Sequence, residues 1–571
     1  MSCTPSRPAI LRTFLCAFLA LLVTTAGASA QTFTSLASFD GANGQNPYNG
    51  PLVQGLDGKL YGTTYAGGAN GTGSVFKVST SGAIMTLYSF CPQDGCLDGA
   101  NPVAGLTLGS NGNFYGTTSG GGADGGYGSV FEITAAGKLT TLHSFDGTDG
   151  AEPTAALIQA ANGSFYGTTP SGGAGDDGTI FEITSAGKFT PLHSFAGTDG
   201  SSPYGSLIQA SNGNFYGTTY GGGSGNGGSG GGTFFEMTLA GKLTTLYNFC
   251  SLEYCEDGTQ PYGGVIQASN GNLYGTTTSG GLPNGNGGFP DAGTVFEITP
   301  EGSGFTSLYS FDTCIGACTD GSAPYGQLIQ GTDGNLYGTT SAGGAKIGGG
   351  TIFQITLAGA LTTIFNNFCP NSSCPNGDEP YAQLVEDTSG VLYGTTHLGG
   401  ASNMGAVFSL SDGLPPFVKT VANSGKVGAK VTILGSKLTG STAVSFNGTA
   451  ATFKVLSSSE ISATVPAGAT TGTITVTTPS GTLATRLAFL VTPQITSFIP
   501  PSGTVGTTVT ITGVSLTETS KVTFGGVSAS FTVDSDTQVT ATVPTGAKMG
   551  KIMITTPGGT ASSASNFTVT T

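Results

Sequence analysis

Seven copies of the tetrapeptide Tyr-Gly-Thr-Thr constrain the fold of this chain more than any other feature. They begin at Tyr61, Tyr115, Tyr166, Tyr216, Tyr274, Tyr337 and Tyr393. Their near-regular recurrence along the chain is typical of repeated structural units. The sequence therefore predicts an array of seven similar units.

Each unit contains four short segments rich in aromatic and β-branched residues, separated by glycine-rich turns. This pattern predicts a four-stranded antiparallel sheet. An Asn-Gly or Asp-Gly pair precedes six of the Tyr-Gly-Thr-Thr copies, and Ser389-Gly390 precedes the seventh. Such pairs tolerate positive φ at both central positions of a two-residue turn, so we expect a tight two-residue hairpin between the first two strands.

The two ends of the repeat region complement each other. The seventh unit stops after residues 407–410 and lacks its last strand, whereas a strand of the missing type, residues 33–39, precedes the first unit. Pairing these segments would remove the exposed edges that an open array leaves. We therefore interpret residues 31–413 as an all-β, seven-bladed β-propeller closed by its N-terminal strand. An open solenoid with distinct capping repeats is the alternative.

After the repeats the composition shifts to Val, Thr and Ser, with Pro415-Pro416 at the junction. Two copies of one pattern follow at a constant offset in the numbering, for example Val431-Thr432-Ile433 with Val509-Thr510-Ile511. Alternating strands broken by Gly and Pro predict two immunoglobulin-like β-sandwich domains, residues 414–492 and 493–571.

Charge and composition exclude several classes of function. The 571 residues include 17 Lys and Arg against 32 Asp and Glu, a net charge of -15, so nucleic-acid binding is not expected. Only 9% of residues are charged, which leaves few groups for acid/base catalysis. Tryptophan, the ring with the largest stacking surface, is absent.

Residues 1–30 have the pattern of an export signal: Arg7 and Arg12, a short apolar run, and Ala28-Ser29-Ala30. We expect cleavage after Ala30, which removes the two arginines and takes the net charge from -15 to -17. No later segment is long and apolar enough to span a membrane. The sequence predicts a secreted or cell-surface protein and says nothing of its oligomeric state.

Eight cysteines follow the leader in four close pairs: Cys91 with Cys96, Cys250 with Cys255, Cys314 with Cys318, and Cys369 with Cys374. An even count in an exported chain favours four short-loop disulfides. A zinc site is the alternative, but these spacings lack the usual C-x2-C form and no His lies beside them.

The repeat units resemble the GloVer tandem repeat of the choice-of-anchor family of exported bacterial proteins, through their Tyr-Gly-Thr-Thr, Gly-Gly and Val-Phe-Glu-Ile elements. That resemblance implies export and a C-terminal surface anchor, and this chain departs from it by showing no recognisable anchor. It implies no catalytic residues. The C-terminal copies resemble IPT/TIG domains through residues 502–506, 509–513 and 522–526 and Val543-Pro544. In exported proteins these domains imply spacers or interaction modules.

In a blade of this kind the loop between strands two and three shares a face with the connection to the next blade. The loop varies most in length, with its longest inserts at residues 221–232 and 280–293, and the connections carry the cysteine pairs. A rigid scaffold with variable loops is a common design for a binding surface.

Each connection also carries Asp/Asn-Gly-x-x-Pro, often followed by Tyr. The candidate ligand face comprises Tyr48, Asp98, Asp149, Asp199, Tyr204, Asp257, Tyr262, Asp320, Tyr325 and Tyr381. One interpretation is a ring of carboxylates and phenols around the channel mouth that could hold Ca²⁺ or a glycan. The other is structural: Asp-Gly forms the turn, Pro fixes the backbone and Tyr packs between blades. No catalytic residue or obligatory cofactor is assigned.

Three functions remain open from the sequence. The first is an exported, non-catalytic binding or adhesion protein whose propeller face engages an extracellular glycan or protein. The second is a polysaccharide-active lyase or hydrolase, because propellers also carry enzymes. The third is a structural component of the cell envelope.

Overall fold

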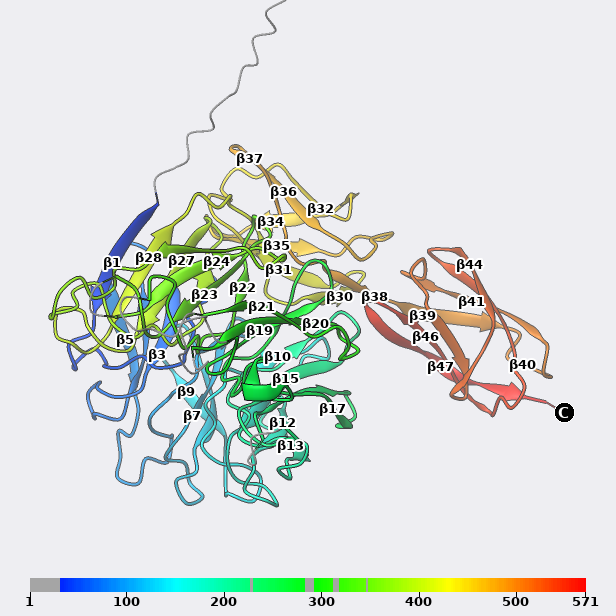
Figure 1. The fold of residues 1–571 in the computed structure, drawn as a ribbon. Coiled ribbons are helices and arrows are strands. Elements are labelled where there is room, and N and C mark those ends of the chain that lie inside the picture. The colour runs from blue at the N-terminus through cyan, green and yellow to red at the C-terminus, as the bar shows by residue number, and fades with distance from the viewer. Residues whose placement is uncertain (1–30, 226–229, 283–291, 312–317, 346–347, 571) are drawn as a thin grey trace, which may run out of the picture.

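The computed structural model describes residues 31–225, 230–282, 292–311, 318–345 and 348–570. Within these ranges the chain is all β apart from one 3-10 turn, η1 (Glu253–Cys255). The described part of the chain contains no helix long and apolar enough to cross a membrane. Figure 1 shows the strands of the repeat region gathered into one body, from which the C-terminal sandwich projects.

Seven four-stranded antiparallel sheets are seen in the described part of the repeat region. The first two consist of β2 (Val53–Gln54), β3 (Leu60–Thr64), β4 (Ser74–Val78) and β5 (Ile84–Ser89), and of β6 (Thr107–Leu108), β7 (Phe114–Thr118), β8 (Ser129–Ile133) and β9 (Leu139–Ser144). The third and fourth consist of β10 (Ile158–Gln159), β11 (Phe165–Thr169), β12 (Thr179–Ile183) and β13 (Phe189–Ser194), and of β14 (Ile208–Gln209), β15 (Phe215–Thr219), β16 (Thr233–Met237) and β17 (Leu243–Asn248). The fifth and sixth consist of β18 (Ile266–Gln267), β19 (Leu273–Thr277), β20 (Thr294–Ile298) and β21 (Thr306–Ser310), and of β22 (Ile329–Gln330), β23 (Leu336–Thr340), β24 (Thr351–Ile355) and β25 (Leu361–Phe365).

The seventh sheet joins the two ends of the repeat region. Its order is β1 (Thr32–Ser38), β28 (Ala406–Ser411), β27 (Val391–Thr396) and β26 (Val385–Glu386). Strand β1 runs antiparallel to β28, with Phe33 opposite Leu410 and Ala37 opposite Val407. The pairing expected between residues 33–39 and 407–410 is therefore present.

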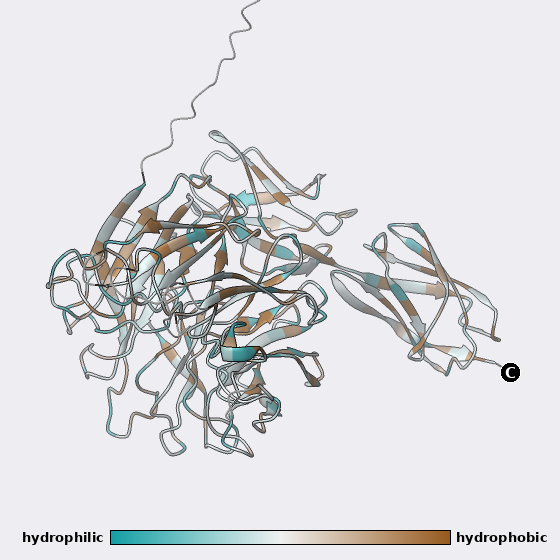
Figure 2. Ribbon diagram, in the orientation of Figure 1, coloured by the Kyte–Doolittle hydropathy of each residue, from teal (hydrophilic) through white to brown (hydrophobic). Residues whose placement is uncertain are grey.

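Successive sheets pack through apolar clusters, and one of these clusters joins the last sheet to the first. It contains Phe39, Tyr393 and Val407 from the seventh sheet and Leu60 and Phe76 from the first. The other clusters join neighbours in sequence order in the same way. Figure 2 shows hydrophobic residues concentrated along the strands that form these interfaces.

The glycine of Tyr-Gly-Thr-Thr is required by the packing within each sheet. Gly167 lies opposite Phe181 in the register of β11 and β12. A Cβ on Gly167 would lie 2.5 Å from Phe181 Cζ and 2.6 Å from Leu157 Cδ2, closer than carbon atoms approach. The phenylalanine of the third strand thus occupies the space that a side chain would fill, which explains why the two residues recur together.

The expected two-residue hairpin was wrong, because the loop has three residues. In the third sheet Ala160 N donates to Ser164 O and Gly163 N donates to Ala160 O, so residues 161–163 form the loop. Only Gly163 has a positive φ, 86°. This is the geometry of a turn closed by a glycine bulge rather than a type I′ turn.

The Asn of the Asn-Gly pair acts through its side chain. Asn162 Oδ1 accepts a hydrogen bond from Ser164 N at 3.0 Å, and its Nδ2 donates to Tyr166 Oη at 2.8 Å. Asp57 makes the corresponding contacts to Lys59 N and Tyr61 Oη. The pair therefore fixes the tyrosine that opens the motif.

The two C-terminal copies have the same strand arrangement. The first comprises β29 (Lys419–Thr420), β30 (Ser424–Lys426), β31 (Lys430–Leu434), β32 (Ala443–Phe446), β33 (Thr449–Ala450), β34 (Phe453–Val455), β35 (Glu460–Thr464), β36 (Ile474–Thr478), β37 (Gly481–Ala484) and β38 (Leu490–Thr492). The second comprises β39 (Gln494–Ile499), β40 (Ser502–Gly503), β41 (Thr508–Val514), β42 (Lys521–Phe524), β43 (Val527–Ser528), β44 (Phe531–Ser535), β45 (Gln538–Thr542), β46 (Gly550–Thr556) and β47 (Gly559–Val569). The sheet order β29-β31-β35-β34 in the first matches β39-β41-β45-β44 in the second. We call these copies the first and second sandwich.

The first sandwich is fixed to the repeat region by an ion pair whose carboxylate is buried and whose arginine is partly exposed. Arg486 Nη1 lies 2.6 Å from Glu386 Oε2, whose side chain is 0% exposed. Thr332 Oγ1 donates to the other oxygen of Glu386 at 2.8 Å, and Arg486 lies over the ring of Phe417 at 4.6 Å. Ser459 Oγ donates to Leu56 O at 2.7 Å. The repeat-region partners at this joint lie in or next to the turns between the first and second strands of their sheets.

Candidate binding face of the repeat region

The connections between sheets and the loops between second and third strands lie on one face. In every unit an isolated antiparallel bridge joins them: Gln45 to Ala66, Ala100 to Gly120, Ala151 to Ser171, Ser201 to Gly221, Thr259 to Ser279, Ser322 to Ala342, and Asp378 to Leu398. The joint to the first sandwich uses turns at the opposite ends of the strands. The two faces of the repeat region therefore differ, and the sandwich leaves the loop-rich face uncovered.

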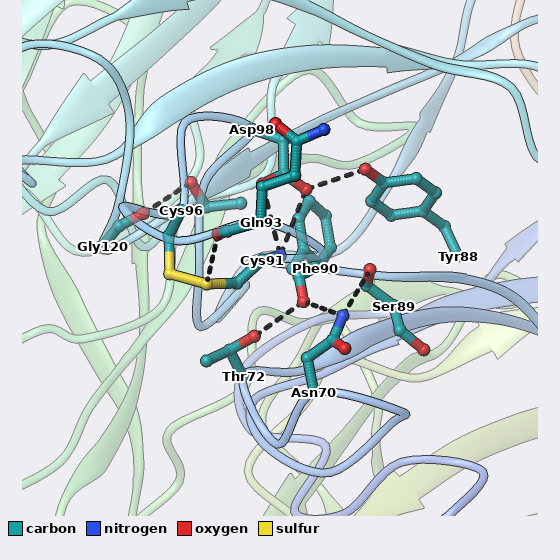
Figure 3. The surroundings of a disulfide bond; sticks show 11 residues. Asn70, Thr72, Tyr88, Ser89, Phe90, Cys91, Gln93, Cys96, Asp98 and Gly120 are labelled. Atoms are coloured by element: carbon teal, nitrogen blue, oxygen red, sulfur yellow. Dashed lines mark hydrogen bonds between the residues drawn. A yellow bond between two sulfur atoms is a disulfide. The ribbon is translucent and has the colours of Figure 1, made fainter.

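Disulfides close the connections on this face. Between residues that the structure describes, three are seen: Cys91–Cys96, Cys250–Cys255 and Cys369–Cys374. The fourth expected pair includes Cys314, which lies outside the described residues. Around the first disulfide Cys91 N donates to Asp98 at 3.2 Å, and Asn70 Nδ2 donates to Phe90 O at 2.8 Å (Figure 3). Each disulfide thus closes a connection that hydrogen bonds also hold.

The residue before the connecting proline adopts a left-handed conformation in every unit. These residues are Asn46, Asn101, Glu152, Ser202, Gln260, Ala323 and Glu379, with φ between 53° and 58°. Such a backbone is costly for a residue with a side chain and persists only where its surroundings hold it. Here the N–H of Glu379 donates to Gly349 O of the preceding unit. This turn sets the direction in which Pro and the following residue enter the next sheet.

The five connecting tyrosines are brought together into one arc. Tyr204 stacks on Tyr262 at 4.8 Å between ring centroids. Tyr262 meets Tyr325 at 5.1 Å, Tyr325 meets Tyr381 at 5.0 Å, and Tyr381 meets Tyr48 at 5.1 Å. We call these five residues the tyrosine arc. All five are half-buried, so each retains accessible surface.

Two further aromatic residues extend the arc. Tyr220 lies 5.5 Å from Tyr204, and His397 lies 5.1 Å from Tyr48 and 5.6 Å from Tyr381. Both occupy the position directly after Tyr-Gly-Thr-Thr. They are the functional candidates that the sequence reasoning missed for this face. Their shared place after the motif, at the entrance to the variable loop, is the signal that could have indicated them.

Burial controls the protonation of this cluster. It raises the pKa of Tyr48, Tyr204, Tyr262, Tyr325 and Tyr381, so the phenols remain neutral hydrogen-bonding groups. Burial also lowers the pKa of His397. The arc therefore presents rings and neutral phenols, with one carboxylate beside them: Glu379 accepts a hydrogen bond from Tyr381 Oη at 3.2 Å.

Two buried polar atoms near this level of the connections have no hydrogen-bond partner among the described residues. They are Nδ1 of His397 and Oγ1 of Thr154, which takes the place of the arc tyrosine in the third unit. Buried polar atoms are rarely left unpaired in proteins, and an unpaired one calls for a water or a ligand.

Next to the arc, the segments that lead into the first strands leave only a small cavity between them. A cavity of about 20 Å³ is lined by Asn49, Pro51, Gly205, Ser206, Gly263, Gly264, Gln327 and Gln383. That volume holds roughly one water molecule. A Cβ on Gly264 would lie 2.2 Å from Ser206 O, which shows how closely the inner backbones approach. A ligand at the arc must therefore bind from the outer side.

The predicted aspartates lie elsewhere in the connections and do not contact the arc. Asp98 and Asp257 accept hydrogen bonds from Tyr88 and Tyr247 of the outer strands, each at 2.8 Å. Asp320 accepts one from Tyr309 at 2.9 Å. His143 and His193 replace these tyrosines opposite Asp149 and Asp199, at 2.7 and 2.8 Å. Each carboxylate thus fastens a connection to its own outer strand.

One group of potential metal ligands exists in the described part of the chain: Cys369, Cys374 and Asp378. The two cysteines form a disulfide with each other, so neither offers a thiolate. The arc contains phenols and one imidazole with a single neighbouring carboxylate, that of Glu379, whereas Ca²⁺ prefers several carboxylate and carbonyl oxygens. The geometry of the arc therefore suits an uncharged polar ligand better than Ca²⁺.

Comparison with known proteins identifies two sequence families. The model of the Gloeobacter/Verrucomicrobia repeat matches residues 22–158, 93–285 and 225–453, and the IPT/TIG domain model matches residues 493–569. No protein with a curated description matches the chain significantly.

Solved structures resemble the chain only distantly. A fungal alcohol oxidase of the AA5 family, in complex with copper, is 14% identical over 78% of this chain and 98% of its own, with a TM-score of 0.44. The extracellular domain of a putative hybrid two-component system from B. thetaiotaomicron is 14% identical over 92% of this chain and 65% of its own, with a TM-score of 0.43. SGBP-B from a xyloglucan utilization locus in Bacteroides uniformis is 26% identical over 26% of this chain, which spans 48% of that protein, with a TM-score of 0.14.

Proposed function

Because this chain belongs to the Gloeobacter/Verrucomicrobia repeat family and carries an IPT/TIG domain, we propose that it is an exported, non-catalytic protein that binds an extracellular glycan. These domains fit an extracellular binding or structural role. Residues 1–30 serve as the export signal, residues 31–413 as the binding domain, and residues 414–492 and 493–571 as two IPT/TIG modules that set its distance from other components.

The binding domain is a closed seven-bladed β-propeller. Support comes from the pairing of β1 with β28 and from the apolar cluster that the first and last sheets share. The narrow cavity, lined by residues that precede the first strands of several units, is what a ring of seven blades leaves at its axis. Closure gives the binding face a rigid base, because no sheet edge is left to open.

The tyrosine arc is the observation that carries the proposed function. Aromatic rings with accessible surface provide faces for the C–H groups of a sugar, and their hydroxyls provide hydrogen bonds. The carboxylate of Glu379, bonded to Tyr381, would repel an anionic glycan, so we propose a neutral one at this position.

A glycan array probed with the mature chain tests the proposal, and binding is then compared between variants. Tyr325→Phe keeps the ring and removes the hydroxyl, and Tyr325→Ala removes both. We expect weaker binding in both variants, with the larger loss in Tyr325→Ala. Tyr88→Phe is the matched control, because Tyr88 lies on an outer strand and its phenol contacts Asp98 of the connection rather than the arc.

Any of three results would defeat the proposal. One is unchanged binding in both Tyr325 variants, which would remove the arc from the site. Another is the release of reducing ends or unsaturated sugars from a bound polysaccharide, which would establish an enzyme instead. Full binding activity in residues 414–571 with none in the repeat region would likewise assign recognition to the sandwiches.

A further inference from the structure

The charge of this protein is divided unevenly between its parts. Residues 31–413 carry 6 Lys and Arg against 28 Asp and Glu, whereas residues 414–492 carry 6 against 1. The second sandwich is balanced, with three of each. The first sandwich is thus a cationic module within an acidic chain, and such contrast between domains indicates a charged partner.

Part of this positive charge lines a groove in the first sandwich. The groove has a volume of about 380 Å³ and is lined by Lys430, Thr452, Phe453, Lys454, Leu456, Ser462 and Thr464. That volume lies within the range of small-ligand sites. It is formed by strands β31, β34 and β35 of the sheet β29-β31-β35-β34.

Strand register places both lysines on one face of this sheet. Lys430 of β31 lies opposite Thr464 of β35, and Lys454 of β34 lies opposite Ser462 of the same strand. Directly opposed residues in antiparallel strands point to the same side. The two ammonium groups therefore flank a central strand that presents hydroxyls.

Neither lysine is neutralised within the protein. In the described ranges no carboxylate oxygen lies within 4.0 Å of Lys430 Nζ or Lys454 Nζ. Glu460 lies on the same face, opposite Leu434, but it is not part of the groove lining. Both lysine side chains are exposed and available to an external anion.

The second sandwich supplies an internal comparison. At the equivalent positions of its pattern Thr508 and Thr532 replace Lys430 and Lys454, and Asp534 replaces Leu456. The remaining lining residues are kept in kind: Phe531 for Phe453, Thr540 for Ser462 and Thr542 for Thr464. The fold therefore does not require the two lysines.

We infer that this groove binds an anionic polysaccharide that carries carboxylate groups, such as a polyuronate. The lysines pair with carboxylates along the chain, Ser462 and Thr464 bond to sugar hydroxyls, and the exposed Leu456 contacts the apolar ring faces. An acidic protein segment would pair with Lys430 and Lys454 but would leave the hydroxyls of Ser462 and Thr464 along β35 without partners. The site is separate from the tyrosine arc and does not depend on it.

Titration of the full mature chain with polygalacturonate tests the inference, with uncharged dextran as the comparison polymer. Lys430→Thr/Lys454→Thr introduces the residues of the second sandwich, so folding should be retained and circular dichroism checks it. We expect polygalacturonate binding to weaken about tenfold. We also expect wild-type binding, but not that of the variant, to fall steeply as salt is raised.

Two further variants separate this site from general charge. Lys521→Thr/Lys548→Thr changes the net charge equally in the second sandwich and should leave binding unchanged. Adding Thr508→Lys/Thr532→Lys/Asp534→Leu to the first double variant rebuilds the groove in the second sandwich and should restore binding.

Several results would overturn the inference. One is that the wild type does not bind polygalacturonate, or binds it no more tightly than the groove variant does. Another is that the wild type binds dextran as tightly as polygalacturonate. A third is that Lys521→Thr/Lys548→Thr loses as much binding as the groove variant. Self-association at low salt that needs Lys430 and Lys454, without polygalacturonate binding, would assign the groove to the acidic repeat region of a second copy. Variants of the tyrosine arc should leave polygalacturonate binding unchanged.

Discussion

Gln54 and Thr388 come from the first and last units of the repeat region and hold them together through two hydrogen bonds. Thr388 N donates to Gln54 Oε1, and Gln54 Nε2 donates to Thr388 Oγ1, each at 3.2 Å. Elsewhere the same contact joins neighbouring units, as between Ala161 N and Gln209 Oε1 at 2.8 Å. The contact between the terminal units thus repeats the one between adjacent units.

Gln54→Leu should weaken this closure. The second unit already has Leu108 at this position, so the side chain fits, but buried polar groups of Thr388 lose their partner. We expect the free energy of unfolding to fall by about 1–3 kcal/mol, measured by urea denaturation. Hydrogen exchange should accelerate in β1 and β28. Gln209→Leu is the control, and equal acceleration of β1 in that variant would contradict a specific role in closure.

Gly167→Ala should destabilise the third sheet. The added Cβ would meet Phe181 and Leu157 at 2.5 and 2.6 Å. Overpacking of this kind costs about 1–3 kcal/mol, which thermal unfolding would detect. Gly163→Ala tests the other mechanism, because a Cβ there meets nothing within 4 Å but φ is 86°. Adding Phe181→Leu should restore part of the stability lost in Gly167→Ala, because it makes room for the new Cβ. It should restore none of the stability lost in Gly163→Ala.

The stability of the joint to the first sandwich should depend on whether Glu386 and Arg486 are both present or both replaced, rather than on the number of charges removed. Arg486→Met leaves the carboxylate of Glu386 buried without a cation and should cost about 2 kcal/mol or more. Glu386→Gln installs the amide that most other units carry at this position. The double variant should therefore be more stable than Arg486→Met alone, and a double-mutant cycle measures the difference. Strict additivity would contradict the pairing.

Lys419 should make the joint sensitive to pH. Burial, aided by the charge of Arg486, lowers the pKa of Lys419 from 10.5 to about 8. Between these values the unfolded chain binds the extra proton, so this residue's contribution to stability rises as pH increases from about 8 to 10.5. Below pH 8 the cost of burying the charge is fully present.

Lys419→Met tests this sign. The variant should be more stable than wild type at pH 7, by about 1–3 kcal/mol, and the difference should shrink toward pH 10.5. Comparing the two proteins cancels the titration of other groups. A difference that is constant across this range would contradict the buried charge.

Reduction of the disulfides should have a modest effect. Cys91 and Cys96 close a loop with a sequence separation of 5, so their cross-link restricts the unfolded chain only slightly. The chain-entropy argument gives about 2 kcal/mol for such a loop. Cys91→Ser/Cys96→Ser should lower the melting temperature by a few degrees and leave the register of β5 intact. If this double variant did not fold, the Cys91–Cys96 disulfide would be essential to the fold and the prediction would be wrong.

The sequence was sufficient for the features that repeat. Seven Tyr-Gly-Thr-Thr copies and the displaced strand at residues 33–39 led to the four-stranded sheets and to the pairing of β1 with β28. The constant offset between the two C-terminal copies led to two sandwiches with one strand order. These features depend on local patterns that recur, which a single chain displays.

Contacts between distant side chains could not be obtained in this way. The sequence placed Asp98 and Tyr204 in one candidate face, but Tyr88 binds Asp98 while Tyr262 packs on Tyr204. Choosing between such partners requires coordinates, because the residue types alone fit both arrangements. The pairing of Glu386 with Arg486 was missed for the same reason.

The left-handed conformation of the residues before the connecting prolines could not be predicted from local sequence preferences. A residue before proline normally favours an extended backbone, so Glu379 gave no signal of a positive φ. Its conformation is imposed by the hydrogen bond from its N–H to Gly349 O, which belongs to another unit. Tertiary contact overrides the local preference here.

The ion pair of Glu386 and Arg486 also determines how the molecule would be displayed. It docks the first sandwich against the turns at one end of the strands, whereas the tyrosines lie at the other end. A partner that binds the C-terminal sandwiches would therefore hold the repeat region from the end opposite the tyrosine arc, and the aromatic rings would face away from that partner. Presentation to a distant polymer would then need no reorientation of the domains.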